Sequence, residues 1–227
     1  RMIVFGGLDS AGAPLADVWE LSLSGPPTWT QLTLSGAPPA RRYHSAIYDP
    51  RRDRMLVFGG STQTGATFGD VWSLWLSPTP RWEQLVAHGG GTGLPRFSHT
   101  ALYDSHRDRM VVFGGGLPAS NDIWELSFAD TIWTLVRPTG ATPAPRLGHA
   151  AVYDGAADRM VVIGGETLNQ PLNDTWELAL SGTPRWSPIA GTGTPPGPRA
   201  YLTAVSDSVN HRAVLFGGFP NVGDPTW

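Results

Sequence analysis

The sequence predicts an all-β protein built from repeated four-stranded antiparallel sheets, and three observations support this. One segment recurs as "RRYHSAIYDPRRDRMLVFGG" (41–60), "RFSHTALYDSHRDRMVVFGG" (96–115), "RLGHAAVYDGAADRMVVIGG" (146–165) and the more divergent "RAYLTAVSDSVNHRAVLFGG" (199–218). Glycine doublets at 6–7, 59–60, 114–115, 164–165 and 217–218 repeat every 50 to 55 residues, a period typical of stacked supersecondary units. The 28 Gly and 21 Pro among 227 residues indicate many turns.

The second copy shows how one unit is expected to fold. Residues 44–48 predict a strand a, and residues 54–58 ("RMLVF") predict a strand b that is apolar on both faces and therefore covered on both sides. Residues 71–76 alternate between large apolar and other side chains and predict a strand c, and residues 82–85 predict a strand d. Each unit therefore supplies four short antiparallel strands.

Tryptophans follow the glycine doublets at fixed places. An Asp-x-Trp comes after each of the first four doublets, and a second Trp follows about ten residues later, at Trp29, Trp82, Trp133 and Trp186. An apolar run ending in Gly-Gly, then Asp-x-Trp and a second Trp, resembles the kelch motif. The pattern PxxRxxHxxxYD…DRMxxFGG is also similar to the kelch domain related to galactose oxidase. The resemblance covers essentially the whole chain and implies a β-propeller of four-stranded blades.

On this reading the chain is a single kelch propeller domain or part of one. Its repeat units span about 1–34, 40–86, 95–136, 145–190 and 198–227, with incomplete blades at both termini. We expect the chain to be an excerpt of a longer propeller; the alternative is a ring that closes imperfectly or with a partner. Open blade edges would allow self-association, because an unpaired strand edge is a template for another strand.

Composition excludes several function classes. The net charge is −3 with no basic block, which argues against nucleic-acid binding. All 16 basic residues are Arg and there is no Cys, so Schiff-base lysines, disulfides and thiolate chemistry are excluded. No apolar run approaches the ~20 residues of a membrane span. We expect no cofactor. The sequence does not indicate a cellular compartment, and a secreted or cell-surface location is compatible with it.

Most repeated residues are expected to be structural. The glycine doublets allow positive φ at the end of strand b. The tryptophans are expected to pack between neighbouring blades, with sugar-binding platforms as the rival function. Paired acids in the a–b hairpins are expected to cap turns by accepting bonds from nearby backbone amides; they are Asp49/Asp53, Asp104/Asp108 and Asp154/Asp158.

The repeated Arg-x-x-His is the sharpest candidate site. Strand a should lie beside the central channel, so the arginines would surround one rim, formed by the d–a and b–c loops. Four guanidinium groups there could hold acidic peptides, carboxylates or acidic sugars, as rim arginines of eukaryotic kelch adaptors do. The competing interpretation is that Arg and His bond a neighbouring blade and lock the ring. The candidates for ligand contact are Arg41, Arg96, Arg146, Arg199, Tyr43, Phe97 and Tyr201; weak metal candidates are His44, His99 and His149.

Variable loops on the same rim are better functional candidates than repeated residues. The b–c loops are "LDSAGAPLA" (8–16), "STQTGATFG" (61–69), "GLPASN" (116–121) and "ETLNQPLN" (166–173). We therefore predict a non-catalytic scaffold that binds a protein or an acidic or glycan ligand on the d–a and b–c loop face.

The alternative is a metal-dependent or carbohydrate-active enzyme domain related to galactose oxidase. The resemblance would then imply a copper centre with a Tyr–Cys cross-link, which a chain without Cys cannot form. No spacing singles out a catalytic acid pair or triad, so no catalytic residue is predicted.

Overall fold

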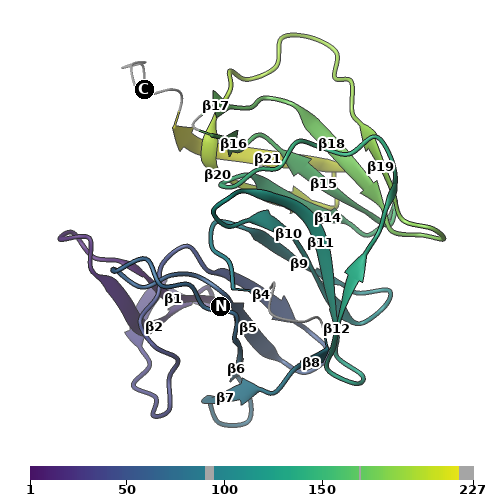
Figure 1. Ribbon diagram of the computed structural model, residues 1–227. Helices are drawn as coiled ribbons and strands as arrows, with labels where there is room; N and C mark the ends of the chain where they lie inside the picture. The colour runs from purple at the N-terminus through teal and green to yellow at the C-terminus, as the bar shows by residue number, and fades with distance from the viewer. Residues whose placement is uncertain (90–94, 169, 220–227) are drawn as a thin grey trace. The chain divides into compact units, whose positions relative to one another are not determined.

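A computed structural model describes residues 1–89, 95–168 and 170–219 (Figure 1). The chain divides into two compact units, residues 1–86 with 91–97 (unit 1) and residues 87–90 with 98–227 (unit 2). Residue 169 of the fourth b–c loop and the tail 220–227 of the last repeat lie outside the described residues. Within the described ranges no helix is long and apolar enough to cross a bilayer.

Unit 1 holds two antiparallel sheets. Sheet 1 has the order β1 (Met2–Leu8), β2 (Pro14–Ser22), β3 (Thr28–Gln31). Sheet 2 has the order β4 (Ser45–Asp49), β5 (Arg54–Phe58), β6 (Val71–Trp75), β7 (Arg81–Leu85). The four strands predicted for the second repeat are confirmed, with ends shifted by at most one residue. Every residue of β5 is buried, as its continuous apolar run predicted.

Unit 2 holds the next sheets in chain order (Figure 1). Sheet 3 comprises β9 (Thr100–Asp104), β10 (Arg109–Gly115), β11 (Ser120–Ser127) and β12 (Ile132–Val136). Sheet 4 comprises β14 (Ala150–Asp154), β15 (Arg159–Ile163), β18 (Thr175–Ala179) and β19 (Arg185–Pro188), and its b–c loop forms the small hairpin β16 (Glu166–Thr167) and β17 (Gln170–Pro171). Sheet 5 is the hairpin β20 (Ala200–Asp207) and β21 (Arg212–Phe219).

Sheets 3 and 4 differ from the predicted four strands. A two-residue strand, β8 (His88–Gly89), pairs in parallel with β12, and β13 (Thr139–Gly140) does the same with β19, so both sheets have five strands. These short polar segments have neither apolar alternation nor β-branched runs. Their pairing is set by the outer strand beside them, which sequence patterns do not reveal.

Sheets 1 and 2, and likewise sheets 3 and 4, pack face to face through one repeated set of apolar side chains. Between sheets 3 and 4, Phe113 and Trp186 lie with ring centroids 5.1 Å apart, and both are almost fully buried. Between sheets 1 and 2, Phe5 and Trp82 meet in the same way at 5.0 Å. The packing role predicted for the second tryptophans is confirmed at Trp82 and Trp186.

The a–b hairpins are held by their acid pairs. In sheet 2, Asp49 Oδ1 accepts bonds from the amides of Arg51 and Arg52 at 3.1 and 3.3 Å, and its Oδ2 accepts one from Arg54 Nε at 3.0 Å. Asp53, the second acid, lies in the left-handed region at φ 46°. The predicted capping role is confirmed for the first acid of each pair, and the Arg of the "DRM" segment completes it; the second acid instead accepts a bond from a tyrosine hydroxyl, as Asp53 does from Tyr48 at 2.9 Å.

Candidate functional site

In two repeats the arginine of the Arg-x-x-His segment is buried and bonds several groups of its own repeat. We call this arrangement the clamp. The Arg41 side chain is fully buried; its Nη1 and Nη2 donate to both carboxylate oxygens of Asp70 at 2.7 and 3.0 Å. It also donates to the carbonyls of Pro39 and Gly59 at 3.1 and 3.0 Å. This arrangement ties the d–a loop to the end of β5 and the start of β6 in the same sheet.

Arg146 repeats this geometry in sheet 4. Its guanidinium is fully buried and donates to Asp174 at 2.6 and 2.8 Å and to the carbonyls of Ala144 and Gly164 at 3.1 and 2.9 Å. Arg199 makes the corresponding backbone bonds, to Gly197 at 3.1 Å and Gly217 at 3.4 Å.

The backbone of the same arginines joins them to the preceding repeat. Arg146 N donates to Ser120 O at 3.0 Å, and Gly115 N donates to Arg146 O at 2.9 Å. At Arg41, Arg96 and Arg199 the amide likewise donates to a carbonyl of the preceding b–c loop or strand c, and the carbonyl accepts from a glycine amide of the preceding doublet. Arg96 is itself buried. Each arginine thus bonds one repeat with its main chain, while the side chains of Arg41 and Arg146 bond their own repeats.

These contacts explain the Asp of Asp-x-Trp. Asp70 Oδ2 also accepts the indole N–H of Trp72 at 2.6 Å. Burial alone would raise the pKa of Asp70, but the bonds from Arg41 and Trp72 outweigh it and hold this pKa below its ordinary value. The sequence analysis placed Arg and Asp-x-Trp in separate roles. Their common spacing of 28 or 29 residues in two repeats was the signal that joined them.

Two of the repeat histidines, His44 and His149, face a phenylalanine ring of the preceding sheet. The His149 ring stands edge-on to Phe113 with centroids 5.0 Å apart, and its Nε2 lies 2.8 Å from Thr100 Oγ1. Burial, with a smaller contribution from the Arg146 charge, lowers the pKa of His149 to about 3. Burial, with a smaller contribution from the Arg41 charge, likewise lowers the pKa of His44 to about 4. Within the described residues, none of the three repeat histidines belongs to a group close enough to share a metal ion.

The third residue of each Arg-x-x-His segment has left-handed backbone. The φ angles are 57° at Tyr43, 52° at Ser98, 61° at Gly148 and 57° at Tyr201. In unit 2 these residues form a chain of bonds: Tyr201 N donates to Gly148 O at 2.6 Å, and Gly148 N to Ser98 O at 2.8 Å. This conformation is costly for every residue except Gly, so the Gly in one repeat was the sequence signal for it.

Both left-handed tyrosines present their side chains to solvent, at 42% exposure each. The Tyr201 hydroxyl donates to Glu166 Oε1 at 3.1 Å, and its ring lies over Gly148. The Tyr43 ring lies 6.3 Å from the Phe97 ring. Two of the aromatic rim candidates are therefore brought together in unit 1, and the third lies beside a b–c loop acid in unit 2.

Sequence reasoning missed Arg42, which lies between the clamp and Tyr43. Its main chain pairs with Ser61 of the b–c loop in both directions, so the two loop types of this repeat lie together. Its guanidinium stacks over the Tyr43 ring at 5.2 Å, and within the described residues it has neither an ion pair nor a side-chain hydrogen bond. Its Nε is buried without an acceptor. We call Arg42, Tyr43 and Phe97 the Arg42 patch.

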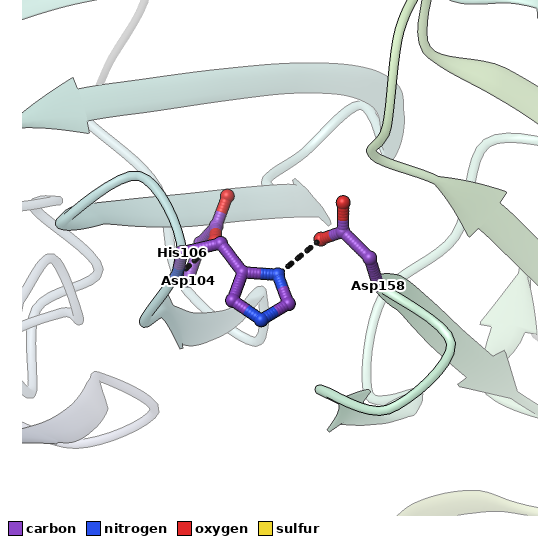
Figure 2. Close-up of side chains that lie close together, drawn as sticks. All are labelled: Asp104, His106 and Asp158. Carbon is purple, nitrogen blue, oxygen red and sulfur yellow. Dashed lines mark hydrogen bonds and ion pairs between the residues drawn. The ribbon is translucent and has the colours of Figure 1, made fainter.

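A second polar cluster lies in the a–b hairpins of sheets 3 and 4. Asp104, His106 and Asp158 offer ligand atoms within 4.8 Å of one another, and Figure 2 shows the His106 ring turned toward Asp158, with 3.3 Å between Nδ1 and Oδ1. Both carboxylates are already bonded by Arg107, at 3.0 Å for Asp104 and at 2.6 and 2.9 Å for Asp158. The Tyr153 hydroxyl donates to both. The cluster therefore acts as an ion-pair network between two hairpins, and we assign it no metal.

The ligand-contact prediction for Arg41, Arg96, Arg146 and Arg199 stays a prediction. What the structure adds is that the guanidinium bonds of Arg41 and Arg146 are internal, whereas Tyr43, two residues after Arg41, is exposed.

Comparison with known proteins agrees with this repeat architecture. Residues 1–118 and 108–225 match the family described as the KLHDC2/KLHL20/DRC7 Kelch-repeats domain. The chain is 30% identical over 139 residues to Adagio protein 3 of Arabidopsis thaliana, covering 57% of this chain and 22% of that protein. It is 32% identical over 139 residues to the flagellar outer-arm dynein alpha chain of Chlamydomonas reinhardtii, covering 57% of this chain and 3% of that one. The chain thus spans about a fifth or less of the length of these relatives.

Among solved structures, that of YjhT is similar in fold. The TM-score is 0.65 at 20% sequence identity, over 89% of this chain and 66% of that chain. The matched residues, the repeated Gly-Gly and Asp-x-Trp motifs and the antiparallel sheets agree: this protein belongs to the kelch-repeat family.

Proposed function

We propose that this kelch domain is a non-catalytic binding module that grips an acidic segment of a partner protein through its d–a and b–c loops. We further propose that its sheets are blades of a propeller, as in the kelch family. The single observation that carries the binding proposal is the unpaired guanidinium of Arg42 beside two aromatic rings.

The chemistry of the Arg42 patch favours a carboxylate ligand. Arg42 is half-buried, and its guanidinium has neither an ion pair nor a side-chain hydrogen bond within the described residues, so a ligand could bond it without displacing an internal partner. A carboxylate offers two acceptors in the geometry that a guanidinium matches, and such charge-assisted bonds are about twice as strong as neutral ones.

The aromatic side chains would supply the apolar part of the contact. Tyr43 is 42% exposed and Phe97 is half-buried, and both are residue types enriched at protein interfaces. Tyr43 also keeps a left-handed backbone that a Gly adopts at the same place in another repeat. Strain held at an exposed residue is typical of binding sites, which supports a role for this side chain beyond packing.

The test is selection from a random peptide library displayed on phage, followed by binding of the enriched peptides to variants. We expect enriched peptides to carry Asp or Glu, and Arg42→Gln to weaken their binding at least about tenfold, the loss of one charge-assisted contact. The matched control is Arg81→Gln, because Arg81, the first residue of β7, stacks on Trp75 of β6, away from these loops. Circular dichroism checks that both variants fold.

Two results would count against the proposal. Enriched peptides without acidic residues would remove its chemical basis. Equal binding to Arg42→Gln and to the parent chain would move the site elsewhere. An acidic oligosaccharide that competes with the peptides at the same residue would shift the ligand class from protein to glycan.

A further inference from the structure

The b–c loop of sheet 4 exposes a leucine at the tip of its hairpin. Thr167 of β16 pairs with Gln170 of β17, so only two residues connect these strands, and Leu168 is the first of them. Two-residue hairpin turns favour Gly, Asn or Asp where φ is positive. Leu168 nevertheless has a φ of 45° and is 87% exposed. A bulky apolar residue is costly in both respects, so neither the turn nor a buried core explains its presence.

A carboxylate without an ion pair lies in the same loop. Glu166 is half-buried, and the Tyr201 hydroxyl donates to its Oε1 at 3.1 Å. Its main chain pairs with Leu147 in both directions, which fixes it against the d–a loop. The nearby Arg146 is bonded to Asp174. Within the part of the chain that the structure describes, Glu166 has no ion pair, so its negative charge is not neutralised there.

This acid is specific to one repeat. Counted from the glycine doublets, the residues that correspond to Glu166 are Leu8, Ser61, Gly116 and Phe219. A charge that occurs in one copy of a repeated position is not needed to build the repeat. It is therefore a better candidate for ligand contact than the arginines and histidines that recur.

Tyr201 presents an aromatic ring beside this carboxylate and is 42% exposed. Tyr43, at the same position of the second repeat, is equally exposed although Phe97 of the following repeat lies beside it, so the exposure belongs to the position. The Tyr43 ring also indicates which group can stack at this position, because the Arg42 guanidinium lies 5.2 Å from its centroid. In the last repeat Ala200 stands in place of Arg42, so the chain supplies no guanidinium from there.

We propose that Glu166, Leu168 and Tyr201 form a docking site for a basic and apolar segment of a partner protein. We call these three residues the Glu166 patch. An arginine of the partner stacks on the Tyr201 ring and pairs with the Glu166 carboxylate, while an apolar neighbour in the partner contacts Leu168. Arginine fits better than lysine because a planar guanidinium can stack on a ring and bond a carboxylate at once. The patch lies in unit 2, binds the opposite charge to the Arg42 patch, and does not rest on the proposed function.

The first experiment selects peptides that need the acid. Random peptides displayed on phage are panned on the immobilised 227-residue protein, with an excess of the soluble Glu166→Gln variant as competitor. We expect the surviving peptides to carry Arg next to an aliphatic or aromatic residue. Acidic peptides that bind the Arg42 patch are removed, since the competitor binds them equally. Failure of this selection is therefore distinguishable from failure of the proposed function.

Fluorescence anisotropy of a labelled surviving peptide then measures the contribution of the charge. Glu166→Gln should weaken binding at least about tenfold, because the amide keeps an acceptor for the tyrosine hydroxyl but loses the charge. The matched control is Glu83→Gln. Glu83 also accepts a bond from an aromatic donor, Trp75 Nε1 at 2.8 Å, but it lies on the outer strand β7 in unit 1. This control should bind the peptide like the parent chain.

Leu168→Asn distinguishes a binding role of this leucine from a structural one. Asn tolerates a left-handed turn better than Leu, so the melting temperature should stay the same or rise. Binding of the peptide should nevertheless fall at least about threefold, because apolar contact area is lost.

Three outcomes overturn the proposal. One is that no peptide survives the competitor. Another is that the surviving peptides lack basic residues. A third is that Leu168→Asn binds the peptide like the parent chain, which would leave the exposed leucine without a part in the site. None of these bears on the Arg42 patch, which is tested by Arg42→Gln.

Discussion

The clamp between Arg146 and Asp174 predicts that two chemically identical substitutions will have unequal effects. Asp174→Asn removes the charge that faces a fully buried guanidinium, although one acceptor oxygen remains. Asp17→Asn changes the same position of the same motif in sheet 1. Asp17 accepts the Trp19 indole at 2.7 Å, but within the described residues it receives no bond from an arginine.

The magnitude follows from burial. Leaving one partner of a buried ion pair unmatched costs about 3–5 kcal/mol. The Asp174 side chain is 40% exposed, so solvent screens part of this interaction and we expect about 2–3 kcal/mol. Asp17→Asn should cost under about 1 kcal/mol, since a neutral acceptor still serves the indole.

The assay is urea unfolding followed by far-UV circular dichroism, at pH 7 and again near pH 3. Burial raises the pKa of Asp174, but the bonds from Arg146 and Trp176 outweigh it and set this pKa below the ordinary 3.8. Stabilisation by the carboxylate is therefore present above pH 4 and is lost as the pH falls further. The difference between wild type and Asp174→Asn should shrink at low pH. The clamp would be refuted if Asp174→Asn and Asp17→Asn lowered the free energy of unfolding equally. It would also be refuted if the difference between wild type and Asp174→Asn persisted at low pH.

Three further predictions concern other parts of the fold. Burial lowers the pKa of His149 to about 3, so stability should already fall as the pH drops below about 6.5, and the lowered pKa of Asp158, caused first by its bond from Arg107, should make the fall steeper below about 4; constant stability between pH 7 and pH 4 would contradict this. Gly165→Ala should cost more than about 2 kcal/mol, because φ is 92° and a Cβ would lie 2.8 Å from that of His149. Its control, Gly182→Ala, has open space and should cost only the left-handed penalty of about 1 kcal/mol. Tyr201→Gly should stay within about 1 kcal/mol of wild type in thermal unfolding, since relief of strain offsets lost contacts, and a loss twice as large would show that its side chain is structural.

The spacing of the sequence repeats was enough to predict most of the fold. Apolar runs and glycine doublets located the strands of sheet 2 within one residue, because buried strands and turns impose strong local patterns. The parallel strands β8 and β13 were not predicted, since two exposed residues carry no periodic signal.

The candidate site was less accessible to sequence reasoning. Arg41 and Arg42 are adjacent arginines in different environments. Arg41 is buried in an ion pair with Asp70, whereas Arg42 has no ionic partner among the described residues. That difference depends on the carboxylate of Asp70, 29 residues away, and on the backbone angle at Tyr43. The carboxylate reaches Arg41 only through the fold, and the residue type of Tyr43 gives no sign of its left-handed backbone.

The attachment of Arg41 and Arg146 to two repeats each, one through the main chain and one through the side chain, has a consequence for how repeats can be cut apart. The Pro-rich loops before these arginines are the obvious boundaries in sequence, and a cut there leaves Arg146 with the later repeat. Its main chain, however, bonds Gly115 at the end of β10 and Ser120 at the start of β11 in the earlier repeat. A segment excised at a proline would therefore lose backbone partners at both ends. A boundary placed just after each Gly-Gly pair would keep Arg146 with Ser120 and Gly164, but it would separate Arg146 from Gly115 and from Asp174. Either cut therefore breaks bonds of the same arginine, so blades are better exchanged between kelch proteins as runs of two or more repeats.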